Sequence, residues 1–135
     1  FGYGPTESYI DKHQSSLLGH YHTTVRQNHV PYLKPQENGS HYGCSYVKVR
    51  SENRQIFITA TTPFSFNLSP YRQEELAMKK HHDDLVESNS TVLCIDYKMS
   101  GIGSNSCGPA LKQPYRLNET LFDFDVKCHF LTHSI

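Results

Sequence analysis

Hydrophobic and polar residues alternate most clearly near the end of the chain, over residues 120–131. The polar positions are Asp123, Asp125, Lys127 and His129, together with one leucine, and the apolar positions between them are Phe122, Phe124, Val126, Cys128 and Phe130. Successive side chains of a strand point to opposite faces, so this alternation predicts a strand with an apolar face that packs and a polar face toward water or a partner.

Three further segments have strand character. Residues 91–99 are largely apolar at both sets of alternate positions, which predicts a central strand. Residues 55–68 are interrupted by Pro63, and because proline cannot donate to a ladder they predict two strands or one bent strand. Residues 42–49 form the fourth candidate, and the Asn38-Gly39 step just before them indicates a turn.

One short helix is expected. It begins after Ser69 and Pro70, a capping residue followed by proline at the first helical position, and ends near His81. Gly2, Gly4 and Pro5 favour a turn at the start, whereas residues 12–30 predict no element. Short aromatic or β-branched segments separated by turn residues indicate an all-β fold.

Chain length, charge and the distribution of apolar residues argue against several classes of function for this sequence. The 135 residues suit one domain or part of one, and 13 basic residues balance 13 acidic residues. Without a net positive field, binding to nucleic acid or to an acidic membrane is not expected. No apolar run is long enough to cross a bilayer, and no secretory leader is evident. The start without Met suggests an excised or processed fragment.

The four cysteines show no zinc-site spacing and lie at positions 44, 94, 107 and 128. Their even number, with N-x-S/T sequons at Asn38, Asn67, Asn89 and Asn118, fits secretion and leaves disulfides open. We favour reduced cysteines, three of them within predicted strands, and sequons that arise by chance in a chain rich in Ser and Thr.

Two clusters carry residues that could do chemistry. Asp123 and Asp125 share one face of the last strand about 6.5 Å apart, within the range for a glycosidase carboxyl pair. The amphipathic alternation explains them better. The run from His81 to Asp84 holds metal-ligand types, but adjacent residues do not converge as i and i+4 residues do, which favours a solvated helix end.

Cys107 is the one cysteine in a predicted loop. The surrounding segment, GIGSNSCGP at residues 101–109, has glycines that permit tight turns and close approach of backbone to a ligand. It lacks the spacing of a dinucleotide fingerprint, and no helix pattern follows it. The chemistry indicates a binding loop and nothing more specific.

This segment resembles the C-terminal signature of the β-galactosidases of glycoside hydrolase family two. Three earlier segments are similar to that family in the same order: GYGPTESYIDK at 2–12, PYLKPQENG at 31–39 and FSFNLSPY at 64–71. The resemblance therefore covers nearly the whole chain. One departure is Lys12, where arginine is usual in the family.

The resemblance implies a fold and also implies which domain of the enzyme carries the catalytic residues. It implies part of a large twisted antiparallel β-sandwich, like that of galactose mutarotases, with the catalytic glutamates in a separate (β/α)₈ barrel. Mg and Na ions would be bound mainly by that barrel, so no catalytic residue, metal ligand or cofactor is expected in this chain. By position, Cys107 stands where the family presents a side chain, Trp or Cys, to the aglycone side of the substrate.

We therefore predict that residues 1–135 are a cytoplasmic, non-catalytic C-terminal domain or small subunit of a β-galactosidase acting on β-galactosides such as lactose. Its partner would be the barrel domain or large subunit, and the fragment alone would self-associate through exposed edges. The alternative is a free-standing carbohydrate-binding module that stacks sugars on Tyr3, Tyr42 or Tyr115. A self-sufficient hydrolase is the third hypothesis.

Overall fold

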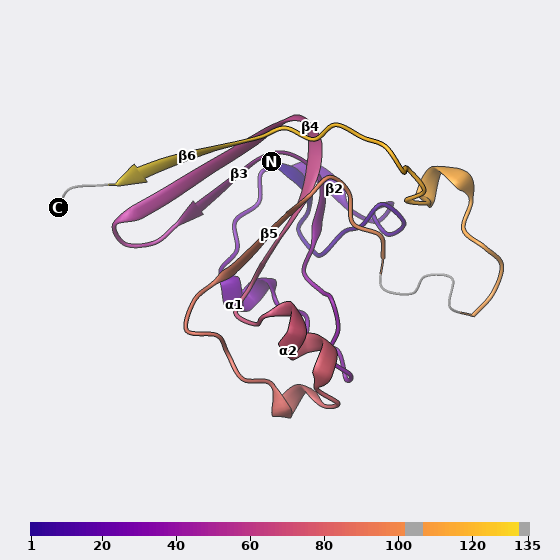
Figure 1. The fold of residues 1–135 in the computed structure, drawn as a ribbon, viewed down its shortest axis with the longest axis horizontal. Helices are drawn as coiled ribbons and strands as arrows, with labels where there is room; N and C mark the ends of the chain where they lie inside the picture. The colour runs from indigo at the N-terminus through magenta and orange to yellow at the C-terminus, as the bar shows by residue number, and fades with distance from the viewer. Residues whose placement is uncertain (102–106, 133–135) are drawn as a thin grey trace.

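The computed structural model describes residues 1–101 and 107–132, which form two antiparallel sheets with few short helices (Figure 1). This confirms the all-β prediction. The small sheet pairs β1 (Gly2–Gly4) with β2 (Leu17–Gly19). The larger sheet contains β3 (His41–Arg50), β4 (Arg54–Ser69), β5 (Val92–Asp96) and β6 (Val126–Thr132).

The long strand β4 organises the larger sheet. It pairs with β3 along most of its length, with β5 at its end (Ser69 opposite Val92) and with β6 at its beginning (Arg54 opposite Thr132). In Figure 1 the distal parts of β3 and β4 extend with β6 as an arm, whereas β5 lies on the side of the helices. The segment 42–49 is thus confirmed as a strand.

Pro63 lies in a bulge of β4. The pairing with β3 runs from Tyr46–Thr59 directly to Cys44–Phe64, so residues 60–63 have no ladder partner on β3. A bulge accommodates proline because no ladder N–H is required there, and it also bends the strand. Of the two alternatives for residues 55–68, the single bent strand is observed (Figure 1).

The hydrophobic core is centred on the β3–β4 pair. Its buried members are Cys44, Val47, Ile58 and Phe64. Two cross-strand rows extend this face over three strands. The inner row is Val47, Ile58 and Cys128, and the outer row is Val49, Ile56 and Phe130. The predicted apolar face of the last strand therefore lies in register with the apolar rows of β3 and β4.

The bounds and environment of the last strand differ from the prediction. β6 begins at Val126, and all of its residues are exposed in this chain. Residues 120–125 do not pair as a strand, because Phe122 and Phe124 turn toward Tyr97: Phe122 stacks on that ring at 4.5 Å between centroids. Side-chain packing outweighs the alternation there, and the apolar face of β6 stays open.

The segment 91–99 is not a central strand. β5 pairs with β4 and with no other described strand, and its residues are all half-buried. The apolar character of both faces misled the prediction, because periodicity reports burial and not the position of a strand in a sheet.

The predicted helix is present but begins later. α2 spans Gln73–Met78, with Leu76 buried on its inner side. Ser69 does not cap it, because this residue ends β4 and its Oγ accepts a hydrogen bond from the Tyr71 N–H at 3.0 Å, which forms a local turn. The predicted cap at Ser69 is therefore wrong, and Arg72 precedes the helix without a side-chain capping bond.

Further short helices occur. α1 (Val25–Asn28) is capped by Thr24, whose Oγ1 accepts from the Gln27 N–H at 3.2 Å. Two 3-10 turns are also present, η1 (His82–Asp84) and η2 (Gln113–Tyr115). In the described residues no helix is both long and apolar enough to cross a membrane.

All four cysteines are free, and Cys44, Cys94 and Cys128 lie in strands as predicted. Cys44 is buried, and burial raises the pKa of its thiol to about 11. The sequon residues Asn38 and Asn67 are also buried. Their side chains are engaged in the fold, so these two sequons carry no information about secretion.

Candidate functional site

Two of the segments that carry the family resemblance, 2–12 and 31–39, meet around Glu7. The side chain of Glu7 is 5% exposed and accepts hydrogen bonds from Lys12 Nζ at 2.7 Å, from the Gly39 N–H at 2.8 Å and from the Tyr32 hydroxyl. Burial alone would raise the pKa of Glu7, but these donors outweigh it and hold the pKa below the usual value. The carboxylate is therefore ionised and is held by three hydrogen-bond donors.

A second network continues this arrangement toward β4. Asn28 Nδ2 donates to the Gly39 carbonyl at 2.8 Å, and Asn28 Oδ1 lies 2.7 Å from His41 Nε2. Asn67 Nδ2 donates to the Asn38 carbonyl at 2.7 Å and to Glu37 Oε1 at 2.9 Å. Residues of the 2–12, 31–39 and 64–71 segments thus hold one another, which gives these motifs a structural role.

Gly39 is required at the centre of this network. Its φ is 71°, in the left-handed region, and a Cβ there would lie 2.5 Å from the Asn28 carbonyl oxygen. Only glycine allows both the backbone conformation and the close approach. The structure has no turn at residues 38–40, so the turn expected at Asn38-Gly39 is not observed, and the glycine is required for its backbone conformation and for packing.

An aromatic cluster lies beside the network, on the face that includes β1 and the start of β3. Tyr3 and Tyr42 stack with ring centroids 6.0 Å apart, and His13 packs against Tyr42 at 4.8 Å. Tyr115 of η2 lies 6.3 Å from His13. The three tyrosines that the sequence offered separately as sugar platforms are thus brought together around one histidine. His13 was missed, because no sequence pattern marks it.

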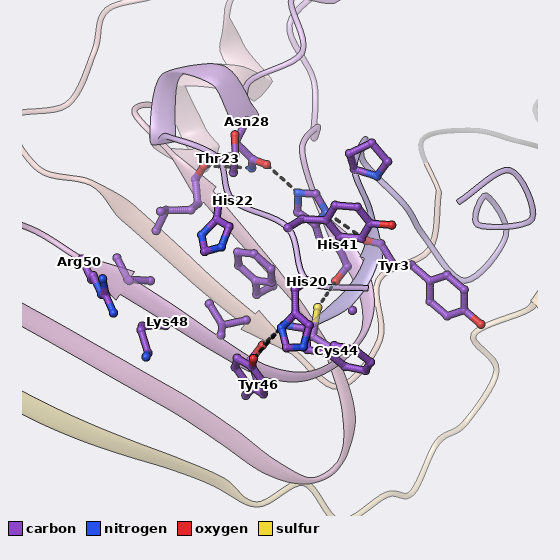
Figure 2. Close-up of a pocket in the computed structure, with 18 residues that line it drawn as sticks. Tyr3, His20, His22, Thr23, Asn28, His41, Cys44, Tyr46, Lys48 and Arg50 are labelled. Carbon is purple, nitrogen blue, oxygen red and sulfur yellow. Dashed lines mark hydrogen bonds between the residues drawn. The ribbon is translucent and has the colours of Figure 1, made fainter. Parts of the chain in front are cut away.

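A pocket of about 360 Å³ opens between β1, residues 20–23 and β3 (Figure 2). His20 Nδ1 lies 2.9 Å from the Tyr46 hydroxyl, and His41 Nδ1 lies 3.3 Å from the Tyr3 carbonyl. Figure 2 shows Lys48 and Arg50 along one side of the same pocket. The described residues that line it are aromatic, apolar, neutral polar or basic, and none is acidic.

This pocket has the wrong chemistry for glycoside hydrolysis, which requires two facing carboxyl groups. Cys44 lines it, but its raised pKa leaves the thiol protonated and unsuited to nucleophilic attack. The aromatic rings, the imidazoles and the two basic side chains that line the pocket suit it to binding a ligand.

Cys107 is exposed, as a loop residue that contacts a ligand would be. Residues 102–106 of its loop lie outside the described residues. Gly101, at the start of the loop, packs directly against the carboxylate of Asp11, so a Cβ there would collide with that side chain. In addition, the Ile10 N–H donates to the Met99 carbonyl at 3.1 Å, which ties the loop to the 2–12 segment.

Four acidic side chains bear on the hypothesis of a catalytic carboxyl pair. Asp123 and Asp125 are exposed, as the amphipathic interpretation expected, but they precede β6 and do not lie on the strand. Sequence reasoning missed Glu37 and Asp96, whose pKa values are both raised by burial. The charge of Asp96 also raises the pKa of Glu37, so these two acids lie near each other. Glu37 lines a second pocket, beside Gln73 and Leu76, but Asp96 does not line it.

The run from His81 to Asp84 was predicted to be a solvated helix end, but α2 ends at Met78 and the run forms a solvated turn that includes η1. His81, Asp83 and Asp84 are exposed, and only His82 is half-buried. Within the part of the chain that the structure describes, no group of three or more His, Cys, Asp or Glu side chains is arranged to hold a metal ion.

Fold and site together define a class: an antiparallel β domain whose motif residues brace the fold and whose pocket between β1 and β3 is lined by no acidic residue. The comparisons give the family. The family model described as beta galactosidase small chain matches residues 1–128, and the chain belongs to this family. The family predicted from the ordered motifs is thus confirmed.

The relatives are β-galactosidases. One from Actinobacillus pleuropneumoniae is 67% identical over 122 residues, covering 90% of this chain and 12% of its own length. One from Staphylococcus xylosus is 39% identical over 131 residues, covering 97% and 13%. One from Kluyveromyces lactis is 33% identical, covering 96% and 12%. The chain thus spans about an eighth of the relatives it matches.

Proposed function

We propose that this chain is the non-catalytic C-terminal β-sandwich domain, residues 1–135, of a β-galactosidase that hydrolyses terminal β-D-galactosides such as lactose. In this proposal it supports the catalytic barrel and the oligomer and lends a loop to the aglycone side of the active site. The observation that carries the proposal is the open apolar face of β6.

That face exposes apolar side chains to water. Cys128 and Phe130 continue the core rows of β3 and β4, yet Phe130 is 73% exposed and Val126, at the same alternate positions of the strand, is 36% exposed. Contiguous apolar surface of this kind marks an interface. The rest of a β-galactosidase is the partner that the family membership favours, and self-association is what we expect of the chain alone.

The test separates the chain from the rest of the polypeptide. The chain and the barrel-bearing remainder are purified apart, then assayed on a chromogenic β-galactoside alone and after mixing. We expect no cleavage by the chain and a gain of activity by the remainder on mixing. Cleavage by the chain alone would instead establish the self-sufficient hydrolase. No binding between the two parts, measured by light scattering, would contradict the scaffold role.

Cys107 is the residue that we propose lies at the aglycone side. Its support is its position in the family signature and its exposure on the loop tied to Asp11. A small thiol leaves more room for the leaving sugar than an indole would, but it offers no stacking face. Aglycone binding should therefore be weaker than in relatives that carry Trp.

The Mg and Na ions expected for the whole enzyme are proposed to be bound mainly by the barrel. A cytoplasmic location is also proposed, and the four free thiols support it because disulfides persist chiefly in oxidising compartments.

One observation favours a second function, carbohydrate binding by this chain. The cluster of Tyr3, Tyr42, Tyr115 and His13 gathers four half-buried rings. Aromatic rings that remain open can stack on sugar faces. Calorimetry of the chain with galactosides tests it: binding lost in Tyr42→Ala and kept in Tyr97→Ala would support a sugar platform. No heat of binding would leave the cluster as packing.

A further inference from the structure

Two histidines from distant segments point their Nε2 atoms at each other. His29 follows α1 and His82 opens η1, and their Nε2 atoms are 3.2 Å apart with ring centroids at 5.3 Å. The solvated-turn interpretation of residues 81–84 holds for its other members but not for His82, which is half-buried against His29.

His29 is held in place on both sides. The preceding residue, Asn28, is buried and donates to the carbonyls of Gly39 and Leu68. The following residue, Val30, donates its N–H to Asn38 Oδ1 at 2.9 Å. The His29 ring also packs edge-on against Tyr71, with centroids 4.9 Å apart. The imidazole is therefore oriented by the fold before any ligand arrives.

His82 is positioned by its own turn. The Leu85 N–H donates to the His82 carbonyl at 3.1 Å, and the Ser88 N–H donates to the Pro70 carbonyl at 2.8 Å, which fixes the turn to the end of β4. The other ring nitrogen, Nδ1, lies 3.8 Å from Oδ1 of the exposed Asp83, which is too far for a hydrogen bond.

The distance between the two Nε2 atoms suits a shared metal ion. Zn–N bonds of 2.0–2.1 Å at a tetrahedral angle separate two ligand nitrogens by about 3.3 Å. In the absence of metal one ring donates to the other. Metal binding needs both Nε2 lone pairs, so the donating ring passes to the tautomer with its proton on Nδ1, and no net proton is released.

The two side chains also have the chemistry that such an ion requires. Imidazole nitrogen is a preferred ligand of Zn²⁺ and Cu²⁺.

We propose that His29 and His82 form a two-imidazole site for a divalent transition metal, Zn²⁺ or Cu²⁺, whose remaining positions are filled by water. The ion would link the segment after α1 to η1. The site is separate from the aromatic cluster, from the loop of Cys107 and from the apolar face of β6.

The test uses the full-length polypeptide that contains this chain, with Mg²⁺ at saturation so that oxygen-ligand sites are filled. Zn²⁺ affinity is measured by calorimetry for the wild type, His29→Asn, His82→Asn and the control His81→Asn, an exposed neighbour. We expect each of the first two variants to weaken one site at least about tenfold, since even outer partners are worth that much. His81→Asn should leave it unchanged.

A second measurement does not depend on the variants folding. Electron paramagnetic resonance of the wild type with one equivalent of Cu²⁺ should show hyperfine coupling to two imidazole nitrogens. Coupling to a single nitrogen or to none at this site overturns the proposal, as does a Zn²⁺ affinity that His29→Asn and His82→Asn both leave unchanged.

Discussion

Phe130 of β6 lies directly opposite Ile56 of β4, and through Ile56 it aligns with Val49 of β3 in one apolar row. Ile56 and Val49 pack against the core, whereas Phe130 is 73% exposed. All three residues of the row are therefore aligned across the strands, but only Ile56 and Val49 are packed. We expect another part of the protein to cover Phe130.

Phe130→Asp tests that interface. In the full-length polypeptide we expect a loss of stability of about 3 kcal/mol, the usual cost of removing a buried aromatic side chain, and weaker assembly. The control is His129→Asp, the adjacent residue on the opposite, polar face of β6. Urea denaturation and light scattering measure both effects. Equal behaviour of the two variants would mean that this face stays in water.

Glu7→Gln tests the network that joins the motif segments. Removal of the charge weakens bonds to Lys12, Tyr32 and Gly39, and we expect a loss of about 2 kcal/mol in the free energy of unfolding at pH 7. Tyr32→Phe, which removes one donor and keeps the ion pair, should lose about 1 kcal/mol. A Glu7→Gln protein as stable as the wild type would show that the network contributes no net stability.

The same carboxylate predicts a pH dependence. Because the pKa of Glu7 is lowered in the folded chain, its stabilisation is complete above the ordinary value of 4.5 and is lost as the pH falls through the folded value. The stability difference between wild type and Glu7→Gln should therefore be largest near neutral pH and shrink in acid. Urea midpoints at pH 7 and in acid measure it, and a constant difference would contradict it.

Gly39→Ala tests the backbone conformation and close packing at this glycine. The alanine would need a φ of 71° and a Cβ 2.5 Å from a backbone oxygen, so we expect a loss of about 1 to 3 kcal/mol, measured by thermal denaturation. Gly19→Ala is the matched control, since its nearest neighbour is the end of the Tyr21 side chain at 3.2 Å, which can move. Equal losses in the two variants would argue against a special role for Gly39.

Cys107→Trp tests the aglycone proposal in the full-length enzyme. An indole would add a stacking face, so we expect acceptor affinity in transglycosylation to rise about 2- to 10-fold. Cys107→Ala, which adds no stacking face, should bind acceptor no more tightly than the wild type. If Cys107→Trp changes neither acceptor affinity nor the product ratio, Cys107 does not contact the aglycone.

The local pattern of residues was sufficient to predict several features of the strands. The alternation around Val126, Cys128 and Phe130 identified the apolar face of β6, and Pro63 marked the bend of β4. These predictions succeeded because they depend on the two-residue period of a strand and on the missing N–H of proline, which are properties of the chain itself. The ordered motifs similarly established the family.

Tertiary packing decided the rest. Phe122 and Phe124 pack against Tyr97 and do not belong to the last strand. β5 pairs only with β4 among the described strands, although both of its faces are apolar. The cluster around His13, the brace around Glu7 and the contact of His29 with His82 join residues far apart in sequence. No local period encodes such contacts, because they depend on how whole segments pack in space.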